Sequence, residues 1–153
     1  AVLADTEGPI TFYEFPVGLA EYNTVQPEQY KDQHWFQQHP PVAVSGLACT
    51  GDALLQQREW IPQLLKLDVE GYEPAVLRGF QQCLQQYSPA VVMEFVTDQL
   101  SASPHREADA FLRQLGYRPH AINHLGLPQL LAQATHAYVQ QTGLRSDNIL
   151  YTK

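Results

Sequence analysis

The stretch LLKLDVEGYEPAVLRGF, residues 64–80, decides the fold, because a short apolar strand in it ends in acidic residues and passes at once into a helix. Alternating apolar residues predict a strand over 64–69, which Gly71 interrupts. Pro74 suits the first turn of a helix. The helix predicted over 74–87 carries one apolar stripe, which comprises Val76, Leu77, Phe80, Leu84 and Tyr87.

The same alternation of strand and helix extends on both sides of this unit. Upstream, the sequence predicts a short strand over 1–4 that leads into a hairpin-like second strand over 10–15, a third strand over 42–48 and a helix over 50–57. Downstream, it predicts strands over 90–96, 117–122 and 148–152, and helices over 104–116 and 128–143. Ser103 is the expected cap of the helix over 104–116, and Gly116 its end. The pattern indicates an α/β fold with a parallel sheet covered on both faces.

Composition predicts one domain over residues 1–153. The chain is 44% hydrophobic and 16% charged, and 9 basic residues stand against 16 acidic ones. A net charge of -7 offers no cationic surface for nucleic acid or for an anionic membrane, so neither is an expected partner. No apolar run reaches the roughly 20 residues that span a bilayer, and no signal peptide is evident. The sequence therefore predicts a cytoplasmic protein.

Two further features complete this outline. Residues 16–41 show no clean period and are predicted to be a long surface excursion, with Trp35 and Phe36 as its anchors. Cys49 and Cys83 are too few and too far apart for a disulfide framework or a zinc site, and are expected to be free thiols.

Acidic residues at strand ends are the main candidates for chemistry. Asp68, Glu70 and Glu94 lie at or near the carboxyl ends of two predicted strands, where ligands bind in open parallel sheets. An alternative for Asp68 and Glu70 is a turn or capping role beside the helix that follows. Glu94 stands in an apolar strand, where an ionised carboxylate needs a partner or an exposed position. Lys66, on the same side of the strand as Asp68, could be an ion-pair partner.

Other motifs in the sequence give weaker evidence for a functional site. His120 and His124 have the spacing of two ligands on a helix, but Pro119 and the strand-like residues around it argue against a helix, so no metal site is predicted. Asp147 and Asn148, before the last strand, suit a turn. The sequence has no glycine-rich dinucleotide motif, phosphate-binding loop, nucleophile elbow or paired cysteines.

The run that decides the fold resembles the central motif of the FkbM family of S-adenosylmethionine-dependent methyltransferases. That motif has the form D-x-x-K-x-D-x-E-G-x-E, then a helix ending in L-x-G, then P-x-x-x-x-E on the next strand. The matching residues here are Lys66, Asp68, Glu70, Gly71, Glu73, Leu77, Gly79, Pro89 and Glu94. The leading acid of the motif is replaced by Gln63 or Leu64. Upstream, Asp5 and Gly8 match the family's A-L-S-D-x-x-G stretch, Asn23 and Thr24 resemble its Asn-Ser/Thr element, and residues 147–153 resemble its last strand.

The resemblance implies a fold, a cofactor and roles for these residues. The fold would be the Rossmann-like sheet of a class I methyltransferase, and the cofactor S-adenosylmethionine. Family members bind that cofactor through a glycine-rich loop and an acid-ended second strand, which this sequence lacks, so it resembles a partial domain without its first two strands. Asp5 would then lie near the adenine. Asp68 is the first candidate for the catalytic base, Glu70 the second and Glu94 a more distant third.

The expected activity is O-methylation of a hydroxyl on a small metabolite or a glycan, with the oligomeric state open. Two alternatives stay open. One is a non-catalytic remnant or interaction module with the same fold, since the cofactor loop is missing. The other is a hydrolase that uses Asp68 and Glu94, which no resemblance supports.

Overall fold

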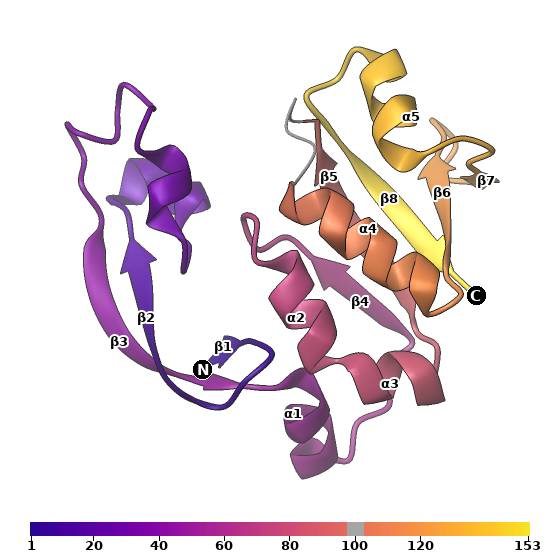
Figure 1. The fold of residues 1–153 in the computed structure, drawn as a ribbon, viewed down its shortest axis with the longest axis horizontal. Coiled ribbons are helices and arrows are strands. Elements are labelled where there is room, and N and C mark those ends of the chain that lie inside the picture. Colours follow the sequence, from indigo (N-terminus) through magenta and orange to yellow (C-terminus); the bar gives the residue numbers. More distant parts are fainter. Residues whose placement is uncertain (98–102) are drawn as a thin grey trace.

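The computed structural model of the chain describes residues 1–97 and 103–153 and divides its strands between two sheets (Figure 1). One sheet has three strands in the order β1-β3-β2, and the other has five in the order β4-β5-β8-β6-β7. The fold is thus a mixed α/β structure, as the sequence predicts. Within the described residues, no helix is both long enough and apolar enough to cross a membrane.

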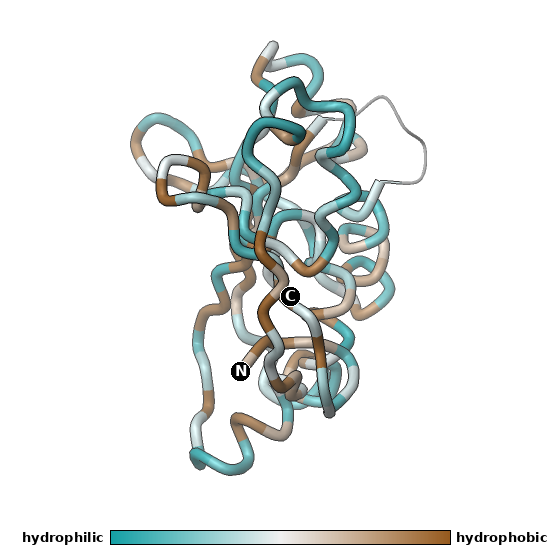
Figure 2. The backbone as a smooth tube through the Cα atoms, turned by 90° about the vertical axis from the view of Figure 1, so that its left-hand side faces the viewer, coloured by the Kyte–Doolittle hydropathy of each residue, from teal (hydrophilic) through white to brown (hydrophobic). Residues whose placement is uncertain are grey.

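The three-stranded sheet contains β1 (Val2–Leu3), β2 (Gly8–Glu14) and β3 (Val42–Cys49). The prediction of a hairpin between the first two strands is wrong, because both pair with β3 instead, β1 in parallel and β2 antiparallel. The connection from β2 to β3 contains two short 3₁₀ helices, Val17–Tyr22 and Pro27–Tyr30. Figure 2, turned by 90° from Figure 1, shows hydrophobic residues interspersed with hydrophilic ones along the chain. In β3, Val42, Val44 and Leu47 are exposed.

The five-stranded sheet contains β4 (Leu64–Leu67), β5 (Ala90–Val96), β6 (Arg118–Ile122), β7 (Pro128–Leu130) and β8 (Ser146–Thr152). The prediction of an all-parallel sheet is wrong in part. Strands β4 and β5 are parallel, but β8 runs antiparallel to both of its neighbours and β7 antiparallel to β6. Strand β4 lies at one edge of this sheet, and β1 at one edge of the smaller sheet.

The described residues form five α-helices: α1 (Gly51–Arg58), α2 (Glu73–Gly79), α3 (Gln81–Gln86), α4 (Pro104–Gln114) and α5 (Thr135–Thr142). The helix predicted over 74–87 is two helices that meet at Phe80. The first part of the helix predicted over 128–143 is strand β7, which pairs with β6. The Ser103 cap is confirmed, since its hydroxyl accepts a hydrogen bond from the Arg106 N–H at 3.2 Å.

Residues of strand β5 alternate between a buried and a half-exposed face. Along β5, Val91, Met93 and Phe95 are at most 1% exposed and join the core formed with the helices, which includes Leu77, Leu112 and Val139. The residues between them, such as Val92 and Glu94, are only partly buried. Among the described residues, the helices therefore cover one face of this sheet, which corrects the prediction of cover on both. The other face is the one that carries Glu94.

Candidate active site

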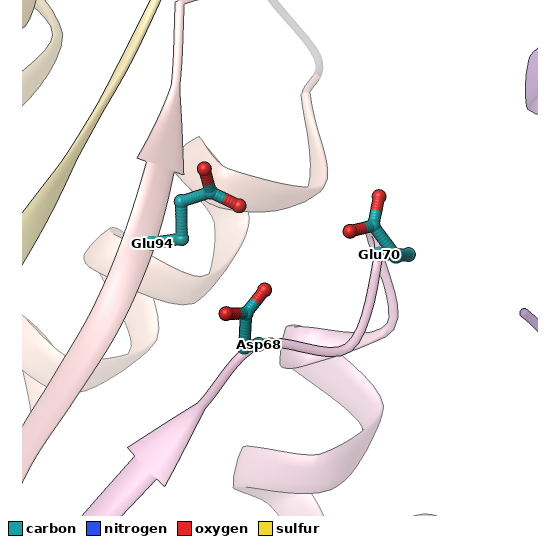
Figure 3. A group of neighbouring side chains, drawn as sticks. All are labelled: Asp68, Glu70 and Glu94. Carbon is teal, nitrogen blue, oxygen red and sulfur yellow. The ribbon is translucent and has the colours of Figure 1, made fainter. Parts of the chain in front are cut away.

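The structure brings Asp68, Glu70 and Glu94 together, with one carboxylate oxygen from each lying within 4.8 Å of the others (Figure 3). Strand pairing accounts for two of them. Lys66 pairs with Val92 and Leu67 with Met93 in parallel register, so the next residue, Asp68, comes level with Glu94. The end of β4 and the body of β5 thereby place two acids side by side on the half-exposed face.

The third acid reaches the group through a tight turn after β4. Glu70 has φ +50° and Gly71 has φ +88°, so two successive residues lie in the left-handed region. Glycine adopts this conformation freely, whereas a residue with a side chain does so at a cost of roughly 1 kcal/mol. The turn directs the Glu70 carboxylate towards the other two acids instead of continuing the strand.

The segment between β2 and β3 holds this turn from outside. The Tyr30 hydroxyl donates a hydrogen bond of 2.7 Å to Glu70 Oε2, and the Gln29 amide donates one of 2.7 Å to the Glu70 carbonyl. Tyr30 is itself packed among aromatic rings around the buried Phe15, which include Tyr22, Trp35 and Phe36. Residues far apart in sequence therefore fix one carboxylate of the group.

The closeness of the three carboxylates and their partial burial shift the pKa values of nearby groups. Partial burial raises the pKa of the Glu70 carboxyl, and the nearby negative charges of Glu94, Asp68 and Glu73 raise it further, while the Tyr30 hydrogen bond opposes the rise. The pKa of Tyr30 is raised as well, first by burial and then by its contact with Glu70. Lys66 forms an exposed ion pair with Asp68, with 3.1 Å between Nζ and Oδ2.

The backbone of the turn after β4 is hydrogen-bonded by a residue other than Asp68 and Glu70, and α2 has no side-chain cap at its first turn. Glu73, in the first turn of α2, accepts hydrogen bonds from the N–H groups of Val69 and Gly71. Among the hydrogen bonds of the described residues, Asp68 accepts from Lys66 and Glu70 from Tyr30, and neither carboxylate accepts from a backbone N–H. Both acids thus point away from the helix and towards Glu94.

Three close carboxylates can accept a proton from a bound hydroxyl, and they could also supply oxygen ligands to a divalent cation. The histidines do not form such a group. His120 lies in β6 and His124 in the turn after it, so the two do not share a helical face.

Asp5 lies apart from the acidic group, beside a cavity of about 290 Å³ that is also lined by Gly71 and Tyr72. Its carboxylate is 3.0 Å from Arg78 Nε, and the other side of that guanidinium contacts Glu107 at 2.6 Å. The cavity connects Asp5 with the turn that carries Glu70, since Gly71 belongs to both.

Four residues that shape this region have no role that the sequence predicts: Gln29, Tyr30, Glu73 and His105. Glu73 was visible as part of the acidic motif. The other three gave no signal, because 41 residues separate Gln29 from its partner and 32 separate His105 from Glu73.

A family model described as Methyltransferase FkbM domain matches residues 3–119 of the chain. The match runs from β1 into β6 and includes Asp5 and all three acids of the group. Neither the curated proteins nor the solved structures gave a match to this chain.

Proposed function

Because the chain belongs to the FkbM methyltransferase family, we propose that it takes part in methyl transfer from S-adenosylmethionine to a hydroxyl group of a small metabolite or a glycan. The observation that carries the proposal is the meeting of Asp68, Glu70 and Glu94 at or near the carboxyl ends of the neighbouring parallel strands β4 and β5. This is where α/β sheets bind ligands.

The cofactor would supply a methyl group on a sulfonium sulfur. The acceptor oxygen would attack the methyl carbon and displace the sulfur, which would leave in S-adenosylhomocysteine. The chain's own residues would bind the acceptor and remove its proton. Asp68 takes the proton from the acceptor hydroxyl as the oxygen attacks. Glu70 is the second candidate for this role, because a base whose pKa is raised towards the working pH is more effective. Glu94 contributes to the negative field around both acids.

The residues around the cavity beside Asp5 would contact only part of the cofactor. Asp5 borders a cavity that adjoins the Glu70 turn, so its carboxylate could accept a hydrogen bond from the adenine amino group. Arg78 already pairs with that carboxylate and would hold it in place. Gly71 and Tyr72 would form the wall of the cavity between Asp5 and the acids.

We also propose that the five-stranded sheet is the later half of a Rossmann-like class I methyltransferase sheet, and that two further strands with the glycine-rich loop belong between β1 and β4. Two features support this. Strands β1 and β4 each lie at the edge of a different sheet, and the second face of the larger sheet lacks helices among the described residues. In such a domain, upstream helices and strands would fill both places.

Calorimetry with S-adenosylmethionine, followed by a methyl-transfer assay with hydroxyl-bearing metabolites and glycans, tests the proposal. The natural full-length protein should bind the cofactor with low-micromolar affinity and form S-adenosylhomocysteine only with an acceptor present. Residues 1–153 alone should bind weakly. Tight binding by residues 1–153 alone would contradict the partial-domain proposal. No binding by the full-length protein would contradict methyl transfer and favour a non-catalytic module.

A further inference from the structure

Glu73 is the most buried carboxylate of the region and has no role in the mechanism above. Its side chain is 1% exposed. An ionised carboxylate at such a position is costly unless hydrogen bonds compensate for the lost water. Glu73 Oε1 accepts one hydrogen bond from Val69 N at 3.3 Å and one from Gly71 N at 3.4 Å.

The second oxygen of Glu73 faces helix α4. Oε2 lies 3.7 Å from Nδ1 of His105, which is also buried, and neither atom has a hydrogen-bond partner among the described residues. This carboxylate therefore stands between the turn after β4 on one side and the first turn of α4 on the other. Its position ties the turn to the packed pair of helices α2 and α4.

The two N–H groups that donate hydrogen bonds to Glu73 flank Glu70 in sequence. One oxygen thus closes the turn across Glu70, whose φ of +50° is otherwise unfavourable for a residue with a side chain. The outer contacts from Tyr30 and Gln29 hold the Glu70 side chain and carbonyl. The inner contact holds the backbone on which Asp68 and Glu70 are mounted.

We propose that Glu73 is a positioning residue for the acidic group. It accepts hydrogen bonds from the N–H groups of Val69 and Gly71, a pair of contacts that we call the clasp, and so keeps Asp68 and Glu70 directed at the reacting atoms. The proposal rests on the proposed function for its catalytic consequence. Glu73 itself touches neither acceptor nor cofactor, because its carboxylate is buried between the turn after β4 and the first turn of α4. Small displacements of the two acids are enough to reduce the rate, since catalysis depends on near-attack geometry.

Two substitutions in the natural full-length protein separate the clasp from simple packing. Glu73→Gln keeps an oxygen for the two N–H groups and places an amide opposite His105 Nδ1, whereas Glu73→Leu fills the space without any acceptor. We expect Glu73→Leu to lower kcat by about tenfold or more, as a misplaced catalytic group does, with the KM for S-adenosylmethionine nearly unchanged. Glu73→Gln should recover most of kcat. Glu7→Leu, at an exposed acid, is the matched control.

Amide hydrogen exchange tests the clasp without reference to activity. In the wild-type protein and in Glu73→Gln, the Val69 and Gly71 amides should exchange slowly, and in Glu73→Leu rapidly. Fast exchange of both amides in the wild type would overturn the proposal even if Glu73→Leu fails to fold. An unchanged kcat in folded Glu73→Leu would also overturn it. Slow wild-type exchange in a protein that transfers no methyl group would retain the clasp and reject the proposed function.

Discussion

Opposing interactions meet at Glu70. It has a left-handed backbone, accepts a hydrogen bond from Tyr30 and lies within reach of two other carboxylates. Crowding of like charges in a partly buried place disfavours ionisation, which explains the raised pKa of its carboxyl. Ionisation of Glu70 at neutral pH therefore lowers the free energy of unfolding.

This electrostatic conflict predicts the effect of Glu70→Gln on stability. A raised pKa in the folded state means that the folded protein binds the Glu70 proton more tightly than the unfolded chain does. The stability contributed by that proton is present below the ordinary glutamate pKa, about 4.3, and is lost as the pH rises through the folded-state pKa. Since glutamine cannot ionise, Glu70→Gln should be more stable than the wild type at pH 7, by up to about 1 kcal/mol for a half-exposed group.

Urea unfolding over a pH series measures this difference. The advantage of Glu70→Gln should shrink as the pH falls through the raised folded-state pKa of Glu70, and should be lost below about 4.3, where the wild-type carboxyl is also neutral. Glu28→Gln, at an exposed position in the second 3₁₀ helix, should show no such trend. A constant difference between pH 4 and pH 7 would mean that charge crowding at Glu70 is not its cause.

At the scale of elements, the junction between β1 and α2 depends on the absence of a side chain at Gly79. A Cβ atom there would collide with the carbonyl oxygen of Ala4, just after β1. Glycine is thus needed at the end of α2 so that the smaller sheet can approach the helix that carries Glu73.

Gly79→Ala should therefore destabilise the protein by about 1–3 kcal/mol, the usual range for overpacking. Gly18→Ala is the matched control, because a Cβ at Gly18 meets nothing within 4 Å. Thermal unfolding of the two variants beside the wild type would measure the contrast. Equal stability of Gly79→Ala and Gly18→Ala would refute the close approach of β1 to α2.

Elements with strong local signals could be predicted from sequence, and those decided by distant partners could not. Ser103 and Pro104 announce α4 because capping is a local interaction. Nothing local marks the break at Phe80, whose ring occupies the space above Gly51. Residues 128–130 have a helix-compatible pattern but pair with β6, so tertiary pairing decided their conformation.

The acidic group could be predicted from sequence where strand register places its residues, but the contacts that hold it come from distant segments and could not. Asp68 follows β4 and Glu94 lies within the neighbouring strand β5, and strand register brings the two positions level with each other. The approach of Tyr30 depends on how residues 16–41 fold back over the sheet, which no short-range pattern specifies. The inner contact between Glu73 and His105 depends likewise on the packing of α2 against α4.

At the scale of the whole molecule, the open sheet edges at β1 and β4 predict the behaviour of residues 1–153 in isolation. Each of β1 and β4 is paired on one side only. Exposed apolar residues lie just before β4, at Trp60 and Ile61, and at its first residue, Leu64. Unpaired edges of this kind invite pairing with another chain. We expect residues 1–153 to self-associate at tens of micromolar in sedimentation velocity, and the natural full-length protein to form a monomer or a discrete oligomer. A stable monomer of residues 1–153 would contradict the partial-domain proposal.

The most direct test of the central claim is the effect of Asp68→Asn on the natural full-length protein, with turnover and cofactor affinity measured on the same sample. Asn keeps the size of the side chain but cannot accept the acceptor's proton as a base, and general-base catalysis contributes typically 10²–10⁴-fold. Asp32→Asn, at an exposed aspartate, is the control. The account predicts that Asp68→Asn lowers methyl transfer by about 100-fold or more, with S-adenosylmethionine affinity within severalfold of the wild type. Unchanged turnover would contradict it and return Asp68 to a structural role.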